Sequence, residues 1–191
     1  LADYSNAAPP ASFENFYGLR DYDFEDIQND MVTGIVEHDF SNSLSLRNLS
    51  RYGRTDRDSA ITAPRFDNVN TSTAIRRQLQ QRQIDHQILA NLTDVNLDFE
   101  TGPVRHALVG GFELSREEQD NRNSAQFENQ PLTDLFEPNP GDDPLGPMPD
   151  IAAPWTHATA DTIGLYVADT LHLTEKWELL GGVRYDHIET D

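Results

Sequence analysis

The chain has 191 residues and a formal net charge of −19, because 33 acidic side chains outnumber 14 basic ones. This acidity argues against nucleic acid as a partner, since no basic surface could neutralise enough phosphates. The sequence holds no run of about 18 apolar residues, which excludes a membrane-spanning helix but not a membrane barrel, whose strands need only one apolar face. Cysteine is absent, which excludes disulfides and thiolate metal sites.

The first predicted elements form a hairpin. Residues 1–20 show no sustained pattern and are expected to be a loop or a truncated segment. The chain starts at Leu1 rather than Met, so we expect it to be an excerpt from a longer protein. Strands are predicted over about 21–40 and 44–57, because apolar residues alternate there on either side of the turn formers at 41–43.

A second hairpin follows a polar segment, 58–74, that is predicted to be a long outer loop. Its strands cover about 75–99 and 104–118 and are joined by a tight turn at 100–103. The apolar residues change parity near Thr93, from Ile84, Ile88, Ala90 and Leu92 to Val95, Leu97 and Phe99. A β-bulge near Thr93 is predicted, because it would restore a single apolar face.

The third hairpin comes after a long segment, 119–158, that is rich in Asn, Asp and Pro and shows no periodicity. Its strands are predicted at 159–173 and 177–190, with apolar residues alternating at Ile163, Leu165, Val167 and Leu171. Long connections are rare in compact domains but usual on the outer side of membrane barrels. The predicted fold class is therefore all-β, an antiparallel up-and-down barrel wall of about six strands in three hairpins.

Three segments carry a family resemblance. They read EHDFSNSLSLRNLSRYGRT at 37–55, NLTDVNLDFETGPVRHALVGGFE at 91–113 and YVADTLHLTEKWELLGGVRYDH at 166–187. In this order and spacing they resemble barrel hairpins of the TonB-dependent outer-membrane receptors. The catecholate-type ferric siderophore receptors are the most similar members.

The resemblance implies a barrel of about 22 strands closed around a plug domain in the bacterial outer membrane. It implies a receptor that imports a ferric siderophore with energy from the TonB complex and that contacts outer-membrane lipid and lipopolysaccharide. Residues 21–191 would be a partial barrel, without the plug and without the N-terminal segment that contacts TonB. The same barrel with cobalamin, heme or a glycan as cargo is left open.

Ligand contacts are predicted from the basic residues. Eight arginines gather around the second strand, the loop after it and the start of the third: Arg47, Arg51, Arg54, Arg57, Arg65, Arg76, Arg77 and Arg82. Guanidinium groups bind carboxylate and catecholate oxygens with fixed geometry. Arg54, Arg57 and Arg65 are predicted to contact an anionic ferric siderophore. The alternative is that these arginines pair with plug carboxylates or with lipopolysaccharide phosphates.

The long acidic loop offers a second set of ligand candidates. Trp155 and His157 are predicted to give an aromatic ligand a stacking surface, although an acidic run is typically a solvated loop. The six histidines have no metal-ligand spacing, and no nucleophile, phosphate-binding or paired-carboxylate motif stands out. We therefore predict no enzyme, no metal site and no cofactor.

A soluble secreted β-sheet module that binds a glycan or a protein is the alternative from another class. The two architectures differ in what covers Leu108, Phe112, Ile163, Leu165, Val167 and Val183. In a barrel wall these side chains form a band with no protein over it. In a sandwich they are buried beneath a second sheet.

Overall fold

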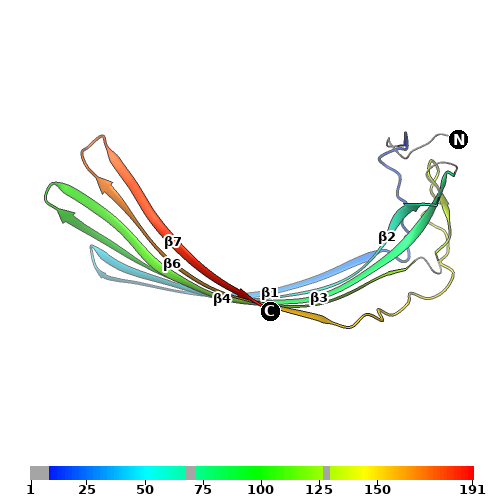
Figure 1. The fold of residues 1–191 in the computed structure, drawn as a ribbon, viewed down its shortest axis with the longest axis horizontal. Helices are drawn as coiled ribbons and strands as arrows, with labels where there is room; N and C mark the ends of the chain where they lie inside the picture. Colours follow the sequence, from blue (N-terminus) through cyan, green and yellow to red (C-terminus); the bar gives the residue numbers. More distant parts are fainter. Residues whose placement is uncertain (1–8, 68–71, 127–129) are drawn as a thin grey trace. The chain divides into compact units, whose positions relative to one another are not determined.

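The computed structural model describes residues 9–67, 72–126 and 130–191. Within these ranges it contains strands and no helix, and so no helix that could cross a membrane. The strands are β1 (Phe24–Ser41), β2 (Leu44–Phe66), β3 (Ala74–Thr101), β4 (Val104–Gln126), β5 (Thr133–Asp134), β6 (Thr156–His172) and β7 (Glu178–Thr190) (Figure 1).

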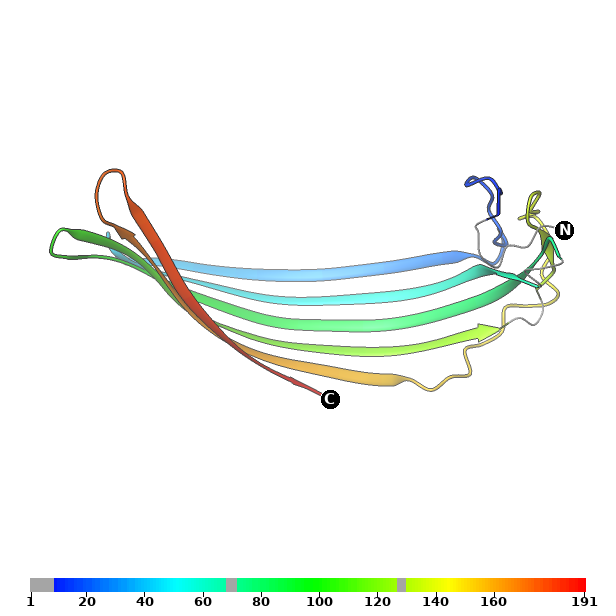
Figure 2. The same cartoon turned by 45° about the horizontal axis from the view of Figure 1, so that its top comes forward.

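The strands form one sheet in the order β1-β2-β3-β4-β6-β7, and the short β5 pairs with β3. Apart from β5, neighbours in the sheet are neighbours along the strand sequence, as the succession of colours from blue to red in Figure 2 shows. β6 and β7 pair antiparallel from Ala160 opposite Thr190 to His172 opposite Glu178. β1 and β7 end the order, so the described residues form a partial, unclosed barrel wall, as predicted.

The strand boundaries differ from the predicted ones at the predicted loops. β2 continues to Phe66 and β4 to Gln126, so residues 58–66 and 119–126 are strand rather than loop. β5 lies within the predicted loop 119–158. Residues 119–126 are mostly polar on both faces, and residues 58–66 mix polar and apolar side chains on both faces. Neither extension shows the apolar alternation from which a strand is predicted.

The chain divides into two compact units. The loop unit comprises Leu1–Gln28, Asp56–Ile84 and Asn121–Thr156, and the hairpin unit comprises Asn29–Thr55, Asp85–Asp120 and His157–Asp191. The hairpin unit contains the three tight turns, which lie together at its left end in Figure 1.

Five of the six apolar side chains that distinguish a barrel wall from a sandwich are exposed. Their exposed fractions run from 37% for Phe112 to 68% for Val183, with Ile163, Leu165 and Val167 between them. Leu108 is half-buried. Every buried apolar side chain among the described residues belongs to the loop unit. Among the described residues there is one sheet, and no second sheet covers these six positions, which argues against the sandwich of a soluble module.

Side-chain contacts define one face of the hairpin unit. The rings of Phe99 and His106 stack with centroids 4.4 Å apart, and His106 Nδ1 lies 2.7 Å from Asp169 Oδ2. Since side chains alternate along each strand, this face also carries the exposed residues that we call the apolar band. They are Val32, Val36, Phe40, Val95, Phe99, Phe112, Leu114, Ile163, Leu165, Val167, Leu179, Val183 and Tyr185.

The opposite face of the hairpin unit is joined by polar contacts between strands. Arg47 Nε donates to Glu37 Oε1 at 3.1 Å, and Arg51 Nε donates to Thr33 Oγ1 at 3.1 Å. Tyr166 of β6 donates to Asp94 of β3, and β4 lies between these two strands in the sheet. One apolar face and one hydrogen-bonded polar face are what a barrel wall requires.

β3 keeps a single alternation through Thr93. Asn91 and Thr93 both hydrogen-bond to Asn48, whereas Asn96 donates to Ser45, so odd positions of β3 meet even positions of β2 on both sides of Thr93. The predicted β-bulge is therefore wrong. The apolar residues before and after Thr93 lie on opposite faces of β3, because an unbroken strand cannot bring both sets to one face.

The loop unit contains a small hydrophobic core. Leu19 and Tyr22, from the segment before β1, pack with Ala60 of β2 and Leu79 of β3, and Met148 covers them. The segment 9–20 has no regular secondary structure, as predicted, but its Leu19 is fully buried. Residues 1–8 of the predicted loop lie outside the described part of the chain.

Arg77 of β3 is fully buried and joins three segments of the loop unit. Its Nε donates to the carbonyl of Tyr17 at 2.8 Å, and its Nη2 donates to the carbonyl of Asn139 at 2.6 Å. Its Nη1 bonds to Asp142 Oδ2 at 2.8 Å and to the carbonyl of Pro131 at 3.4 Å. A buried guanidinium is tolerated only when it is paired and hydrogen-bonded, so Arg77 is a structural residue.

Asp134 of β5 caps the turn that follows it. Its Oδ1 accepts hydrogen bonds from the N–H groups of Phe136, at 2.8 Å, and Glu137, at 3.2 Å, and its Oδ2 accepts one from the Thr73 hydroxyl at 2.8 Å. The N–H of Phe136 first, and then the Thr73 hydroxyl and the Glu137 N–H, hold the pKa of the Asp134 carboxyl below its usual 3.8.

Replacement of Arg77 by Leu is expected to release the segments around Tyr17 and Asn139. The change removes four hydrogen bonds, of which the one to Asp142 is also an ion pair, a loss of about 3 kcal/mol in local stability. Hydrogen exchange of the complete receptor should show faster exchange of the amides at 130–142. Arg65→Leu, at an exposed position of the same unit, serves as control. Equal exchange in both variants would contradict the structural role of Arg77.

The turn capped by Asp134 should depend on pH. Because the pKa of Asp134 is lowered on folding, the ionised carboxylate stabilises the turn at pH values above 3.8, and this contribution is lost as the pH falls through the lowered folded-state pKa. Amides 136 and 137 should exchange faster in Asp134→Asn than in the unchanged protein at pH 7, after correction for intrinsic rates. The difference should shrink and then vanish as the pH falls through the lowered pKa of the Asp134 carboxyl. A difference that persists below that pKa would rule out the carboxylate as its cause.

Candidate functional site

Arg57 of β2 is the predicted ligand residue with the clearest binding geometry. Its Nη2 lies 2.5 Å from Glu25 Oε1 in the loop unit. Its Nε is buried and has no hydrogen-bond partner among the described residues. Arg57 and Arg82 both line a pocket of about 430 Å³.

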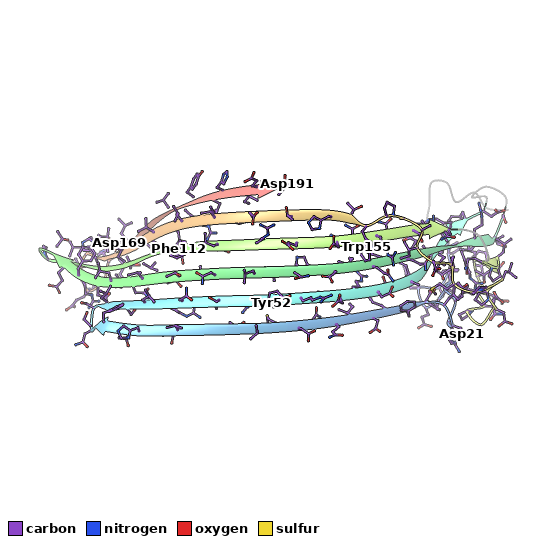
Figure 3. All side chains as sticks on the ribbon, turned by 90° about the horizontal axis from the view of Figure 1, so that it is seen from below. Asp21, Tyr52, Phe112, Trp155, Asp169 and Asp191 are labelled. Carbon is purple, nitrogen blue, oxygen red and sulfur yellow. The ribbon has the colours of Figure 1, made fainter. Side chains whose placement is uncertain are left out.

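Arg65 and Trp155 also belong to the loop unit. Arg65 is exposed, and its Nη1 donates to the carbonyl of Pro64 at 3.0 Å. The ring of Trp155, labelled just before β6 in Figure 3, is half exposed. The Arg122 guanidinium lies 4.7 Å from the centroid of this ring, and Arg122 Nε donates to Gln83 at 2.7 Å. One face of Trp155 is thus occupied by a cation–π contact.

Arg54 and His157 belong to the hairpin unit. Arg54 Nη2 lies 2.5 Å from Asp85 Oδ2, and His157 Nδ1 lies 2.8 Å from Asp120 Oδ1. Asp85 has the same parity on β3 as Phe99, so Arg54 lies on the face of the apolar band. The five predicted ligand residues are therefore divided between the two units.

The polar face of the hairpin unit holds a cluster to which the sequence analysis assigned no role. Tyr166 donates to Asp94, and Arg184 Nη2 bonds to Glu113 Oε2 at 2.7 Å and to Asp186 Oδ1 at 2.7 Å. The Arg184 guanidinium lies 5.7 Å from the centroid of the Tyr166 ring. Alternation predicts that Tyr166 lies opposite the apolar residues of β6, but no local pattern identifies partners on β3 and β4.

Gly111 of β4 makes room for this cluster. A Cβ atom at Gly111 would lie 2.4 Å from the carbonyl oxygen of Thr93 and 2.5 Å from the Tyr166 hydroxyl. The phenol therefore lies directly over the glycine, in the space that a side chain would fill. Gly111 thus permits the close approach of Tyr166 to β4.

Acidic and histidine side chains are common in the chain but do not converge. Across residues 9–67, 72–126 and 130–191, no group of three or more is placed to hold a metal ion.

The sheet order, the exposed apolar band and the polar opposite face together define an outer-membrane β-barrel wall. The family model described as TonB dependent receptor-like, beta-barrel, matches residues 1–191. The chain belongs to the TonB-dependent receptor β-barrel family. The family consists of transport receptors rather than enzymes and is located in the bacterial outer membrane.

Curated relatives and solved structures agree with this assignment. The chain is 32% identical over 187 residues to the Catecholate siderophore receptor Fiu of Escherichia coli, covering 93% of this chain and 24% of that receptor. It is 31% identical over 195 residues to the Probable TonB-dependent receptor BfrD of Bordetella pertussis, covering 94% of this chain and 26% of the relative. The chain therefore spans about a quarter of the length of these relatives.

The crystal structure of the Ferric-Catecholate import receptor Fiu from E. coli, in its closed form, superposes with a TM-score of 0.79 at 29% identity. The match covers 92% of this chain and 25% of that one. The siderophore receptor PiuA from Acinetobacter baumannii shares the fold, with a TM-score of 0.79 at 21% identity over 95% of this chain and 28% of that one.

Membership of an outer-membrane barrel family gives each face of the hairpin unit an environment. In outer-membrane barrels the apolar face of the wall borders lipid and the opposite face lines the lumen, so the face that carries Tyr166 and Arg184 corresponds to the lumen face. Figure 3 labels Phe112, a member of the band, on β4. Since Arg54 lies on the face of the band, its position weighs against contact with a ligand in the lumen.

Gly111→Ala is expected to destabilise the barrel of the complete receptor by roughly 1–3 kcal/mol, because the new methyl group overlaps a backbone oxygen and the Tyr166 hydroxyl. The measurement is the temperature at which the folded barrel loses its compact mobility on a denaturing gel. Gly181→Ala is a matched control, since no atom lies within 4 Å of the added Cβ. If both variants melted at the same temperature, the fit of Tyr166 over Gly111 would be without consequence.

Proposed function

We propose that this chain is part of the wall of an outer-membrane receptor that binds a ferric siderophore and imports it. The observation that carries this proposal is the 32% identity to a catecholate siderophore receptor over 93% of the chain. Because the chain spans 24% of that relative, binding and import are activities of the complete receptor, including its plug domain.

The charge pattern of the chain supports an anionic cargo in spite of its net charge of −19. Two of the predicted ligand arginines, Arg57 and Arg65, belong to the loop unit. Guanidinium groups bind catecholate and carboxylate oxygens through paired N–H donors. Arg57 is the preferred contact, because it lines a pocket together with Arg82 and none of the lining residues of that pocket is a carboxylate. Contacts by Arg54, Arg65, Trp155 and His157 stay predictions.

The proposed partners follow from the family. The receptor takes energy from the TonB complex through a segment that contacts it, and its own plug domain fills the lumen. The apolar band borders outer-membrane lipid, and the residues above the band border lipopolysaccharide. Of these proposed partners, the described residues support only the contact with lipid, because the apolar band is exposed.

Uptake by cells tests the proposal. An iron-starved host that lacks its own siderophore receptors, supplied with the complete receptor, should grow on a ferric tris-catecholate complex. The same host without TonB should not grow, because the energy for release of the ligand is missing. Growth in both hosts would exclude energised import. Growth on heme, cobalamin or a glycan in place of the ferric complex would replace the proposed cargo with that compound.

A further inference from the structure

A pocket of about 430 Å³ lies over β2, β3 and β4 within the loop unit. Arg57 and Ser59 of β2, Gln80 and Arg82 of β3 and Asn123 of β4 line it. Its volume is in the range of small-molecule sites. The pocket therefore has the size to admit one group of a larger ligand.

The pocket and the hydrophobic core lie on opposite faces of the same strands. Ala60 of β2 and Leu79 of β3 are core residues, and their direct neighbours Ser59 and Gln80 line the pocket. Successive side chains of a strand point to opposite faces. The core residues therefore do not cover the face of the strands that carries the pocket.

Two guanidinium groups give the pocket an excess of positive charge. Arg57 is paired with Glu25, while its buried Nε lacks an acceptor. Arg82 is exposed and forms no ion pair within the part of the chain that the structure describes. The other lining side chains are neutral, and none is a carboxylate, in a chain with 33 acidic residues.

An anionic oxygen placed in the pocket would lie beside the guanidinium groups of Arg57, whose side chain is partly exposed, and Arg82, which is exposed. The exposed Asn123 would add a neutral donor. Charge-assisted hydrogen bonds of this kind are about twice as strong as neutral ones.

We propose that this pocket is an anion subsite that binds a catecholate group of the ferric siderophore, with Arg57 and Arg82 as its principal donors. The inference rests on the proposed function, because that function supplies the ligand. A carboxylate of the plug domain is the competing occupant, and the experiment separates the two.

The test uses the complete receptor, purified in detergent, and a ferric tris-catecholate complex as probe. The dissociation constant is measured by quenching of tryptophan fluorescence for Arg57→Gln and Arg82→Gln. Each variant should bind about ten-fold more weakly, the change expected on loss of a charge-assisted contact. Affinity should also depend less on salt in each variant, because one cation of the pocket has been removed. Arg105→Gln, an exposed arginine of the hairpin unit, should leave both values unchanged.

Arg82→Gln decides the outcome even if Arg57→Gln fails to fold, because Arg82 is exposed and pairs with no described residue. Unchanged affinity in Arg82→Gln, with tight binding by the wild type, would overturn the subsite and leave the proposed function intact. Unchanged affinity together with a less stable barrel would assign the pocket to a plug carboxylate and also overturn the subsite. A wild-type receptor that neither binds nor imports the ferric complex would overturn the proposed function, and the subsite with it.

Discussion

A strand inside a lipid bilayer must form all its backbone hydrogen bonds with neighbouring strands, because the bilayer core contains no water to replace a missing partner. The pairing of β6 with β7, unbroken from Ala160 to His172, meets this requirement over the length that a bilayer demands of a barrel strand, about 9–11 residues. The alternation of side chains follows directly from such pairing. Every other feature of the hairpin unit depends on which face each residue takes as a result.

The two units solve the burial of apolar surface in different ways. The hairpin unit has no hydrophobic core among its described residues, and its Ile163, Leu165 and Val183 are exposed. The loop unit buries Leu19 and Leu79 in one hydrophobic cluster. The buried Arg77 then joins the loop segments through carbonyl oxygens that no strand can satisfy. The hairpin unit thus exposes its apolar side chains, whereas the loop unit encloses its own and is joined by the hydrogen bonds of Arg77.

The arginines illustrate how position in the fold separates residues of one type. Arg77 is fully buried and structural, Arg54 lies on the face of the apolar band, and Arg57 lines a pocket without carboxylates. The prediction from sequence treated these residues as one cationic segment, because they are close along the chain. Neighbouring residues of a strand lie on opposite faces of the sheet. Residues a few positions apart on one strand can belong to different units. Ligand binding is therefore a property of single positions rather than of the segment.

The sequence by itself determined the hairpins, the turns between them and the exposed apolar alternation of β6 and β7, since each depends on residues that are close along the chain. It also determined the family, through three motifs in order. It failed in the extensions of β2 and β4, which show no apolar alternation, and where it took the parity change near Thr93 for a bulge. Only the tertiary structure decided that Arg77 reaches Tyr17 and Asn139, that Tyr166 lies over Gly111 and that Arg57 shares a pocket with Arg82. Such contacts join residues on different strands, and no local period in the sequence records the register or the face in which those strands meet.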